Sequence, residues 1–245
     1  MYKPGITLIT PTGDRPAAIK RCIFQMERQT LKPDQWIVAD DGKKEMQKYF
    51  ENISFPVTYI KNEYNKSKGK SFLRNLTTAL KNIQYNKILV IEDDDWYHPE
   101  YIEVTKQRLQ NANIVGQPNA LYYNILTQSY RQNHNTKRAS LCETAFDEKL
   151  IGYMLKRCSS GKSTFVDAHL WHHSRNKNNI IFRLFEDRRL VVGMKGFPGR
   201  KGIGIGHRPT KSFKFDPNFQ FLKKIIGSED TKYYIDLKLK ILGKK

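Results

Sequence analysis

Residues 88–96 read ILVIEDDDW, four apolar side chains followed at once by four acidic ones. A short run that is apolar on both faces predicts a buried strand in a sheet that is covered on both sides. Four acids at the end of such a strand are costly to desolvate unless a cation lies beside them. Because one residue separates Asp93 from Asp95, both can face one hard cation such as Mg²⁺ or Mn²⁺. A solvated acidic turn is the alternative.

Strand-like and helical stretches alternate around this run. Apolar strand patterns occupy residues 6–10, 36–39, 57–60 and 88–91, and apolar residues at helical spacing occupy 19–26 and 73–83. This alternation predicts an α/β fold with a mostly parallel sheet. Ligands of such sheets bind beyond the carboxyl ends of the strands. Thr10, Asp40, Asp41 and the acid run all follow their strands at that edge.

The second half of the chain is less regular. We expect a strand at 120–126, a loop or hairpin at 127–140, a helix over 146–155 and a short strand at 163–166. Six glycines between residues 193 and 206 predict a mobile loop. Residues 213–242 are apolar and lysine-rich, which predicts a partly helical segment. The predicted domains are an α/β domain over 1–212 and a basic, partly helical extension over 213–245.

The net charge of +19 is the compositional outlier in this chain of 245 residues. A field of that sign attracts polyanions, namely nucleic acid, anionic lipid headgroups or nucleotide phosphates. A solvated basic surface without a specific partner is the alternative. No apolar run approaches the ~18 residues that span a bilayer, and no signal peptide pattern is present. Three cysteines without CxxC spacing fit reduced thiols. We therefore expect a cytoplasmic protein, in the host cytoplasm if it is viral.

Four motifs, taken in order, resemble those of the family 2 glycosyltransferases over roughly residues 5 to 207. They are Thr10-Pro11-Thr12 with Arg15, then Asp40-Asp41-Gly42, then Gly69 with Arg74-Asn75, and last Asp93-x-Asp95. Their order and spacing carry the resemblance. It implies the GT-A fold, which is a Rossmann-like, mostly parallel central sheet flanked by helices. The C-terminal helical extension is added to that fold here.

The resemblance also implies what the residues of these motifs bind. The donor would be a nucleotide-sugar, for which a UDP-sugar is the family's commonest choice, and the cation would be Mn²⁺ or Mg²⁺ on its diphosphate. Donor-binding roles fall on Thr10, Pro11, Thr12, Arg15, Asp40, Asp41, Gly69, Arg74, Asn75, Asp94, Arg200 and Lys201. Metal-binding roles fall on Asp93, Asp95 and His207, with an ordinary surface histidine as the alternative for His207.

Transfer with inversion at the sugar needs a general base that takes the proton of the acceptor hydroxyl. In the family this base is an acid in a later acidic motif, which Asp167 matches best. Val166 stands where the family shows the first acid of that pair. A helix-capping role is the alternative for Asp167, and Glu186 and Asp187 are the other candidates for the base.

Three hypotheses for the acceptor follow from the charge. The preferred acceptor is a hydroxymethylated base of DNA, as in small basic glycosyltransferases of bacteriophages, because a phosphate backbone favours a basic surface. The second is an anionic glycan or lipid-linked acceptor at a membrane face, reached through the basic, apolar segment 223–245. The third is a non-enzymatic nucleic-acid-binding module. The QxxRW motif of processive synthases is missing, which favours addition of one sugar at a time.

Overall fold

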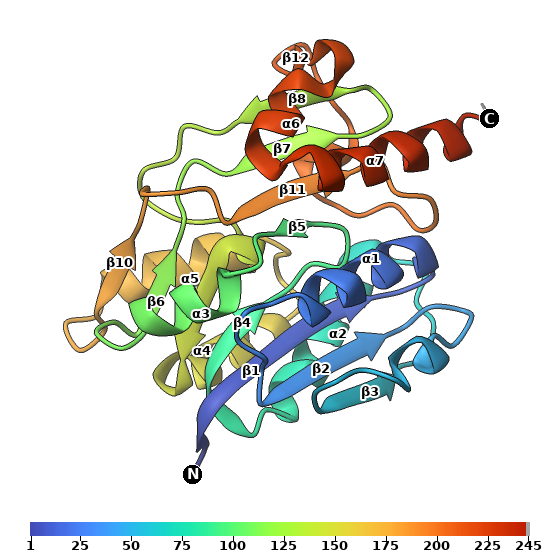
Figure 1. The fold of residues 1–245 in the computed structure, drawn as a ribbon. Coiled ribbons are helices and arrows are strands. Elements are labelled where there is room, and N and C mark those ends of the chain that lie inside the picture. The colour runs from blue at the N-terminus through green and yellow to red at the C-terminus, as the bar shows by residue number, and fades with distance from the viewer. Residues whose placement is uncertain (244–245) are drawn as a thin grey trace.

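The computed structural model describes residues 1–243, except for the side chains of Lys68 and Ile205. Within that range a central sheet of seven strands runs through the molecule (Figure 1). These strands are β1 Lys3–Thr12, β2 Gln35–Asp40, β3 Val57–Lys61, β4 Tyr85–Val90, β6 Ile114–Gly116, β9 Thr144–Asp147 and β10 Phe182–Leu184. Their spatial order is β10-β6-β9-β4-β1-β2-β3. Only β9 runs antiparallel to its neighbours, so the mostly parallel sheet is confirmed.

Alternate side chains of each central strand enter two separate cores, as the double-sided apolar pattern predicts. In β4, Leu89 packs into one core and Ile88 into the other, and all of their side-chain surface is buried. The first core lies under α1 and α3, and the second lies under α2, α4 and α5. These helices are α1 Pro16–Glu27, α2 Lys68–Lys81, α3 Tyr101–Arg108, α4 Ile151–Ser159 and α5 Val166–Arg175. The fold is therefore an α/β sheet with helices on both faces, as the GT-A prediction requires.

A second, smaller sheet lies above the first and was not foreseen (Figure 1). Its strands are β5 Trp96–Tyr97, β7 Leu121–Asn124, β8 Ser129–Gln132, β11 Val191–Lys195 and β12 Lys214–Phe215. β7 and β8 form a hairpin, in agreement with the loop or hairpin predicted at residues 127–140. Short 3₁₀ helices complete the chain: η1 Gln47–Phe50, η2 Leu141–Glu143, η3 Glu148–Leu150, η4 Ile205–His207 and η5 Pro217–Phe219.

Two local predictions in the second half were wrong. Phe146 belongs to β9 and pairs with Ile88 and Ile114, so the predicted helix over 146–155 begins only at Ile151. The predicted strand at 163–166 is a turn that leads into α5. In both places a few apolar residues lie at the boundary between two elements, so their spacing matches neither a helix nor a strand.

The C-terminal segment folds as α6 Gln220–Ile226 and α7 Ser228–Ile241, which pack on the second sheet (Figure 1). Asp230 of α7 is 5% exposed and accepts hydrogen bonds from Arg21, Arg28 and the indole of Trp96. These contacts hold the pKa of Asp230 below its usual value, because they outweigh the effect of burial. A domain boundary at residue 212 stays a prediction. The segment beyond it is bonded through Asp230 to Arg21 of α1 and to Trp96, which follows the acid run.

No helix in residues 1–243 combines the length and the apolar character needed to cross a lipid bilayer.

Replacing Asp230 with Ala is expected to lower the free energy of unfolding by about 3–5 kcal/mol, because Arg21 and Arg28 would stay partly buried without their partner. Urea unfolding followed by circular dichroism measures this change. Asp236→Ala, at an exposed position of the same helix, is the control and should change stability by less than about 0.5 kcal/mol. Equal effects of the two substitutions would contradict the anchoring role of Asp230.

Candidate active site

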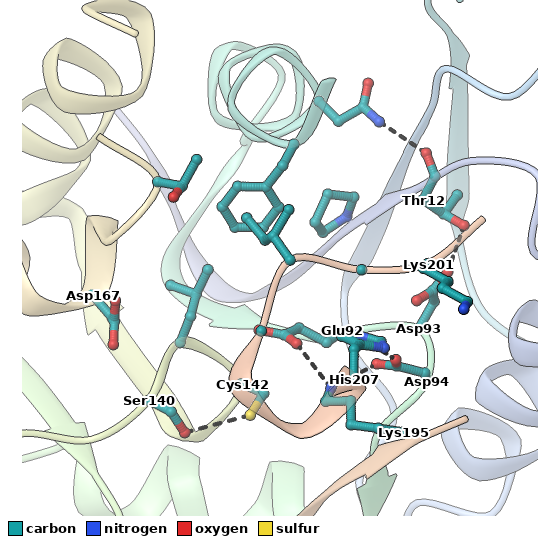
Figure 2. A pocket seen from close by; sticks show the side chains of 18 of the residues that line it. Thr12, Glu92, Asp93, Asp94, Ser140, Cys142, Asp167, Lys195, Lys201 and His207 are labelled. Carbon is teal, nitrogen blue, oxygen red and sulfur yellow. Dashed lines mark hydrogen bonds and ion pairs between the residues drawn. The ribbon is translucent and has the colours of Figure 1, made fainter. Parts of the chain in front are cut away.

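A cavity of about 260 Å³ opens at the carboxyl ends of the central strands (Figure 2). It brings together most of the residues that the sequence singled out. Those that line it are Pro11, Thr12, Arg15, Asp41, Asn75, Asp93, Asp94, Asp167, Arg200, Lys201 and His207. Thr10, Asp40, Gly69, Arg74 and Asp95 do not appear among its lining residues in the described part of the chain.

The acid run turns away from β4, and its carboxylates share two cations, Arg15 and Lys195. Arg15 donates to Asp93 at 2.6 Å and to Asp94 at 2.5 Å, and the Thr12 hydroxyl donates to Asp93 at 2.6 Å. Burial dominates for Asp93 and raises its pKa to about 6, although Arg15 opposes the shift. For Asp94 the effect of burial is outweighed by Arg15 and Lys195, which hold its pKa well below the usual range. Asp94 is therefore the firmly ionised acid that faces the cavity.

Asp95 does not line the cavity with Asp93, so the binding of one cation by both carboxylates stays a prediction. Its side chain is fully buried and accepts from the ammonium of Lys195 at 2.6 Å. The same ammonium lies 3.0 Å from Asp94 and 3.4 Å from Glu92. Burial by itself lowers the pKa of Lys195, but these three carboxylates raise it well above its ordinary value. Asp93 and Asp95 point to opposite sides of the turn because a one-residue spacing fixes no common direction outside a strand.

His207 approaches the acid run from the glycine-rich segment 193–206 and from η4. Its Nε2 atom lies 3.7 Å from the Oδ2 atom of Asp94, and both side chains line the cavity. The backbone of Gly202 lies against the imidazole, since a Cβ atom at that position would come within 2.1 Å of Nε2. An imidazole nitrogen and a carboxylate oxygen at this spacing can share one divalent cation.

At the other end of the cavity, Asp41 gathers the predicted donor-binding residues around one carboxylate. Arg200 donates to it at 2.8 Å, and Arg74 and Asn75 donate at 3.2 Å. Asp41 is fully buried, and Arg200 reaches it from the glycine-rich segment. Arg74 thus acts on the cavity through Asp41 without lining it. The result is a polar corner made from three segments that lie far apart in the sequence.

The remaining predicted residues that do not line the cavity support it from behind. Asp40 is buried and accepts from the backbone N–H of Gly42 at 2.7 Å and from the hydroxyl of Tyr59. The hydroxyl of Thr10 accepts from the indole of Trp36 at 2.9 Å inside the core. Gly69 is the second residue of α2, where a Cβ atom would stand 3.0 Å from Thr164 of the cavity wall. The donor-binding roles of Thr10, Asp40 and Gly69 therefore stay predictions.

Asp167 lies in the first turn of α5, across the cavity from the acid run (Figure 2). Its carboxylate pairs with Arg138 at 2.6 Å, and 14% of its side chain is exposed. Burial raises the pKa of Asp167 and outweighs the effect of Arg138, which makes it a better proton acceptor than an exposed carboxylate. The two other candidates for the base, Glu186 and Asp187, are exposed and line no part of the described cavity.

Several cavity residues were missed by sequence reasoning. The acidic wall also contains Glu92, and the rest of the wall contains Tyr122, Asn133, Arg138, Ser140, Cys142 and Phe165. Lys195 had a signal in the sequence, because a lysine that ends the apolar strand LVVGMK has to find acidic partners when it is buried. Tyr122 lies in β7 of the second sheet and residues 133–142 follow β8, so no local pattern reveals their placement.

A mostly parallel sheet with an acidic cavity at its carboxyl edge is the architecture of the GT-A glycosyltransferases. Residues 7–165 match the family described as glycosyl transferase family 2, so this chain belongs to that family. The fold is also that of S. aureus TarS. TarS 1-349 in complex with UDP superposes with a TM-score of 0.57 at 13% identity, covering 79% of this chain and 60% of that one. The complex of TarS 1-349 with UDP-GlcNAc gives 0.56 at 14% identity, covering 86% and 62%.

Two curated relatives share part of the sequence. An uncharacterized glycosyltransferase of Haemophilus influenzae is 32% identical over 110 residues, which are 44% of this chain and 36% of that protein. Glycosyltransferase GlyA of Streptococcus pneumoniae is 28% identical over 208 residues, which are 79% of this chain and 27% of that protein. The chain therefore matches about a third or less of the length of each relative.

Proposed function

We propose that this protein transfers a sugar from a UDP-sugar to a hydroxyl group of an acceptor, with inversion at the sugar carbon. The observation that carries the proposal is the pairing of Asp94 with His207 on one side of the cavity and the placement of Asp167 on the other. A donor held between them would present its sugar to Asp167. Residues 1–212 would carry this reaction, and residues 213–245 would support it through Asp230.

The residues around Asp94 fit a divalent cation such as Mn²⁺ or Mg²⁺. Asp94 supplies an ionised oxygen and His207 a ring nitrogen, while Asp93 and Arg15 hold the turn in place. When bound, the cation neutralises the charge that builds on the diphosphate as the sugar C–O bond breaks. We place Asp94 in this role instead of Asp95, because Asp94 lines the cavity together with His207, whereas Asp95 is fully buried and does not line it.

The protein's own side chains supply the rest of the chemistry. Asp41, with Arg200, Arg74 and Asn75, offers a corner of fixed donors and acceptors for the base and ribose. Arg200 and Lys201 bring positive charge to the mouth of the cavity near the diphosphate. Asp167 takes the proton of the acceptor hydroxyl, which attacks the sugar from the face opposite the leaving group. Arg138 orients the Asp167 carboxylate through its 2.6 Å contact.

For the acceptor we propose a polyanion, with a hydroxymethylated base of DNA preferred over an anionic membrane glycan. The net charge of +19 and the cationic residues Arg138 and Lys201 at the cavity support this choice. A DNA base would have to leave the duplex to reach Asp167. The non-enzymatic alternative is disfavoured, because a cavity lined by Glu92, Asp93 and Asp94 would repel a bound phosphate backbone unless a cation intervened.

Incubation of the protein with Mn²⁺, a panel of UDP-sugars and hydroxymethylcytosine DNA tests the acceptor directly. Mass analysis of the nucleosides is expected to show a glycosylated base, with a yield that falls as salt rises because phosphate contacts are lost. Plain DNA is the matched control. Transfer of sugar to a lipid-linked glycan but not to this DNA would identify the glycan as the acceptor. The proposed transferase activity would still hold. Hydrolysis of no UDP-sugar in any arm would contradict the enzyme.

Asp94→Asn is expected to weaken Mn²⁺ binding by at least about tenfold, since even residues that only orient metal ligands change affinity 10–100-fold. Electron paramagnetic resonance of free Mn²⁺ measures the affinity. Asp95→Asn is the matched comparison and should retain the cation, because Asp95 does not line the cavity whereas Asp94 does. A larger loss of Mn²⁺ in Asp95→Asn than in Asp94→Asn would restore the original pairing of Asp93 with Asp95.

Asp167→Asn is expected to lower kcat by about 10²- to 10⁴-fold, because the amide cannot accept the acceptor proton. Donor binding, measured by isothermal titration with UDP, should stay unchanged. Asp187→Asn serves as the control, since Asp187 is exposed and pairs with Arg108 away from the cavity. If Asp187→Asn lost activity and Asp167→Asn kept it, the base would be misassigned.

A further inference from the structure

A second potential metal site lies at the acidic wall of the cavity, because Glu92 and Cys142 both line it and Asp95 lies beside them. Glu92, Asp95 and Cys142 each offer one ligand atom, and these atoms lie within 4.8 Å of one another. Asp95 is fully buried and Cys142 is 2% exposed. One carboxylate oxygen of Asp95, Oδ2, is buried and has no hydrogen-bond partner. Two carboxylates and a thiol form a ligand set that suits Zn²⁺ and other thiophilic ions better than Mn²⁺ or Mg²⁺.

The ammonium of Lys195 lies beside the carboxylate of Glu92 (Figure 2), and it also pairs with the buried Asp95. It donates to Asp95 at 2.6 Å and contacts Glu92 at 3.4 Å, and only 2% of its side chain is exposed. The Lys195 stem lies under the turn that carries His207, because a Cβ atom at Gly206 would come within 2.7 Å of its Cγ atom. Lys195 therefore contacts the carboxylates of Glu92 and Asp95, and also the carboxylate of Asp94 at 3.0 Å. Its stem contacts the turn that carries His207.

We propose that Lys195 is a specificity-determining residue that occupies the cation position of the Glu92–Asp95–Cys142 cluster and keeps thiophilic metals out of it. The divalent cation of the reaction is thereby confined to Asp94 and His207, and this second statement rests on the proposed function. Because the ammonium of Lys195 is part of the chain, it neutralises Glu92 and Asp95 at any concentration of free metal. A metal at this cluster would also need the thiolate of Cys142.

The test is a titration of the purified protein with CdCl₂, followed by the ultraviolet charge-transfer absorption of cadmium bound to thiolate. Wild-type protein is expected to show no such band in its folded state. Lys195→Met removes the ammonium but keeps a stem of similar length, and it is expected to gain the band at one Cd²⁺ per chain. The double variant Lys195→Met/Cys142→Ser should lose the band again, because Cys22 and Cys158 lie elsewhere in the buried cores.

Lys232→Met, at an exposed position of α7, is the matched control and should behave like the wild type. A band in the folded wild type that disappears in Cys142→Ser would overturn the proposal. A folded Lys195→Met protein without a band would do so as well.

Loss of the ammonium leaves buried carboxylates without their counter-charge, so Lys195→Met can lose its fold in the presence of EDTA. In that case the same variant is refolded with CdCl₂. Recovery of near-ultraviolet circular dichroism supports the proposal, and failure to recover contradicts it. Since the titration contains no sugar donor, its outcome is independent of whether the protein transfers sugar. If no UDP-sugar were hydrolysed but the cadmium band appeared in Lys195→Met, the proposed function would be wrong. The role of Lys195 at the Glu92–Asp95–Cys142 cluster would still hold.

Discussion

Four carboxyl groups follow β4, three of them almost fully buried, and two cations from distant parts of the chain pair with them. Arg15 reaches Asp93 and Asp94 from the start of α1, and Lys195 reaches Asp94 and Asp95 from the end of β11. Ionised carboxylates this deeply buried are tolerated only when such partners compensate the lost hydration. The first helix, the acid turn and the second sheet therefore have to be placed together, and the cavity exists where they meet.

The same principle organises the opposite end of the cavity around Asp41. A fully buried carboxylate there draws Arg74 from α2 and Arg200 from the glycine-rich segment, which otherwise has little apolar surface to hold it. Each buried acid thus adds an electrostatic contact to a distant segment. The cavity lies between the two compensated centres, with Asp94 on one side and Asp167 on the other.

The central sheet could be predicted from the sequence because its strands are apolar on both faces and end in polar residues. That pattern is local, and it placed Thr12, Asp41, Asn75, Asp93 and Asp94 correctly at one edge. The assignment of Asp95 to the metal stays a prediction, and the sequence could not settle it, since the direction of a side chain in a turn depends on partners such as Lys195 that lie 100 residues away. The second sheet escaped for a related reason. Its strands are two to five residues long and are held by pairing between distant segments, so they leave no periodic signature.

Gly202 lies close to the imidazole of His207, and it leaves room for the ring because glycine has no side chain. A single methyl group at residue 202 would overlap the ring nitrogen, so every larger residue there must displace either the ring or the loop that carries it. Residue 202 is in this sense a spacer whose size tunes the position of a side chain five residues further on. The geometry opposite Asp94 can consequently be altered by changing a residue that has no functional group at all.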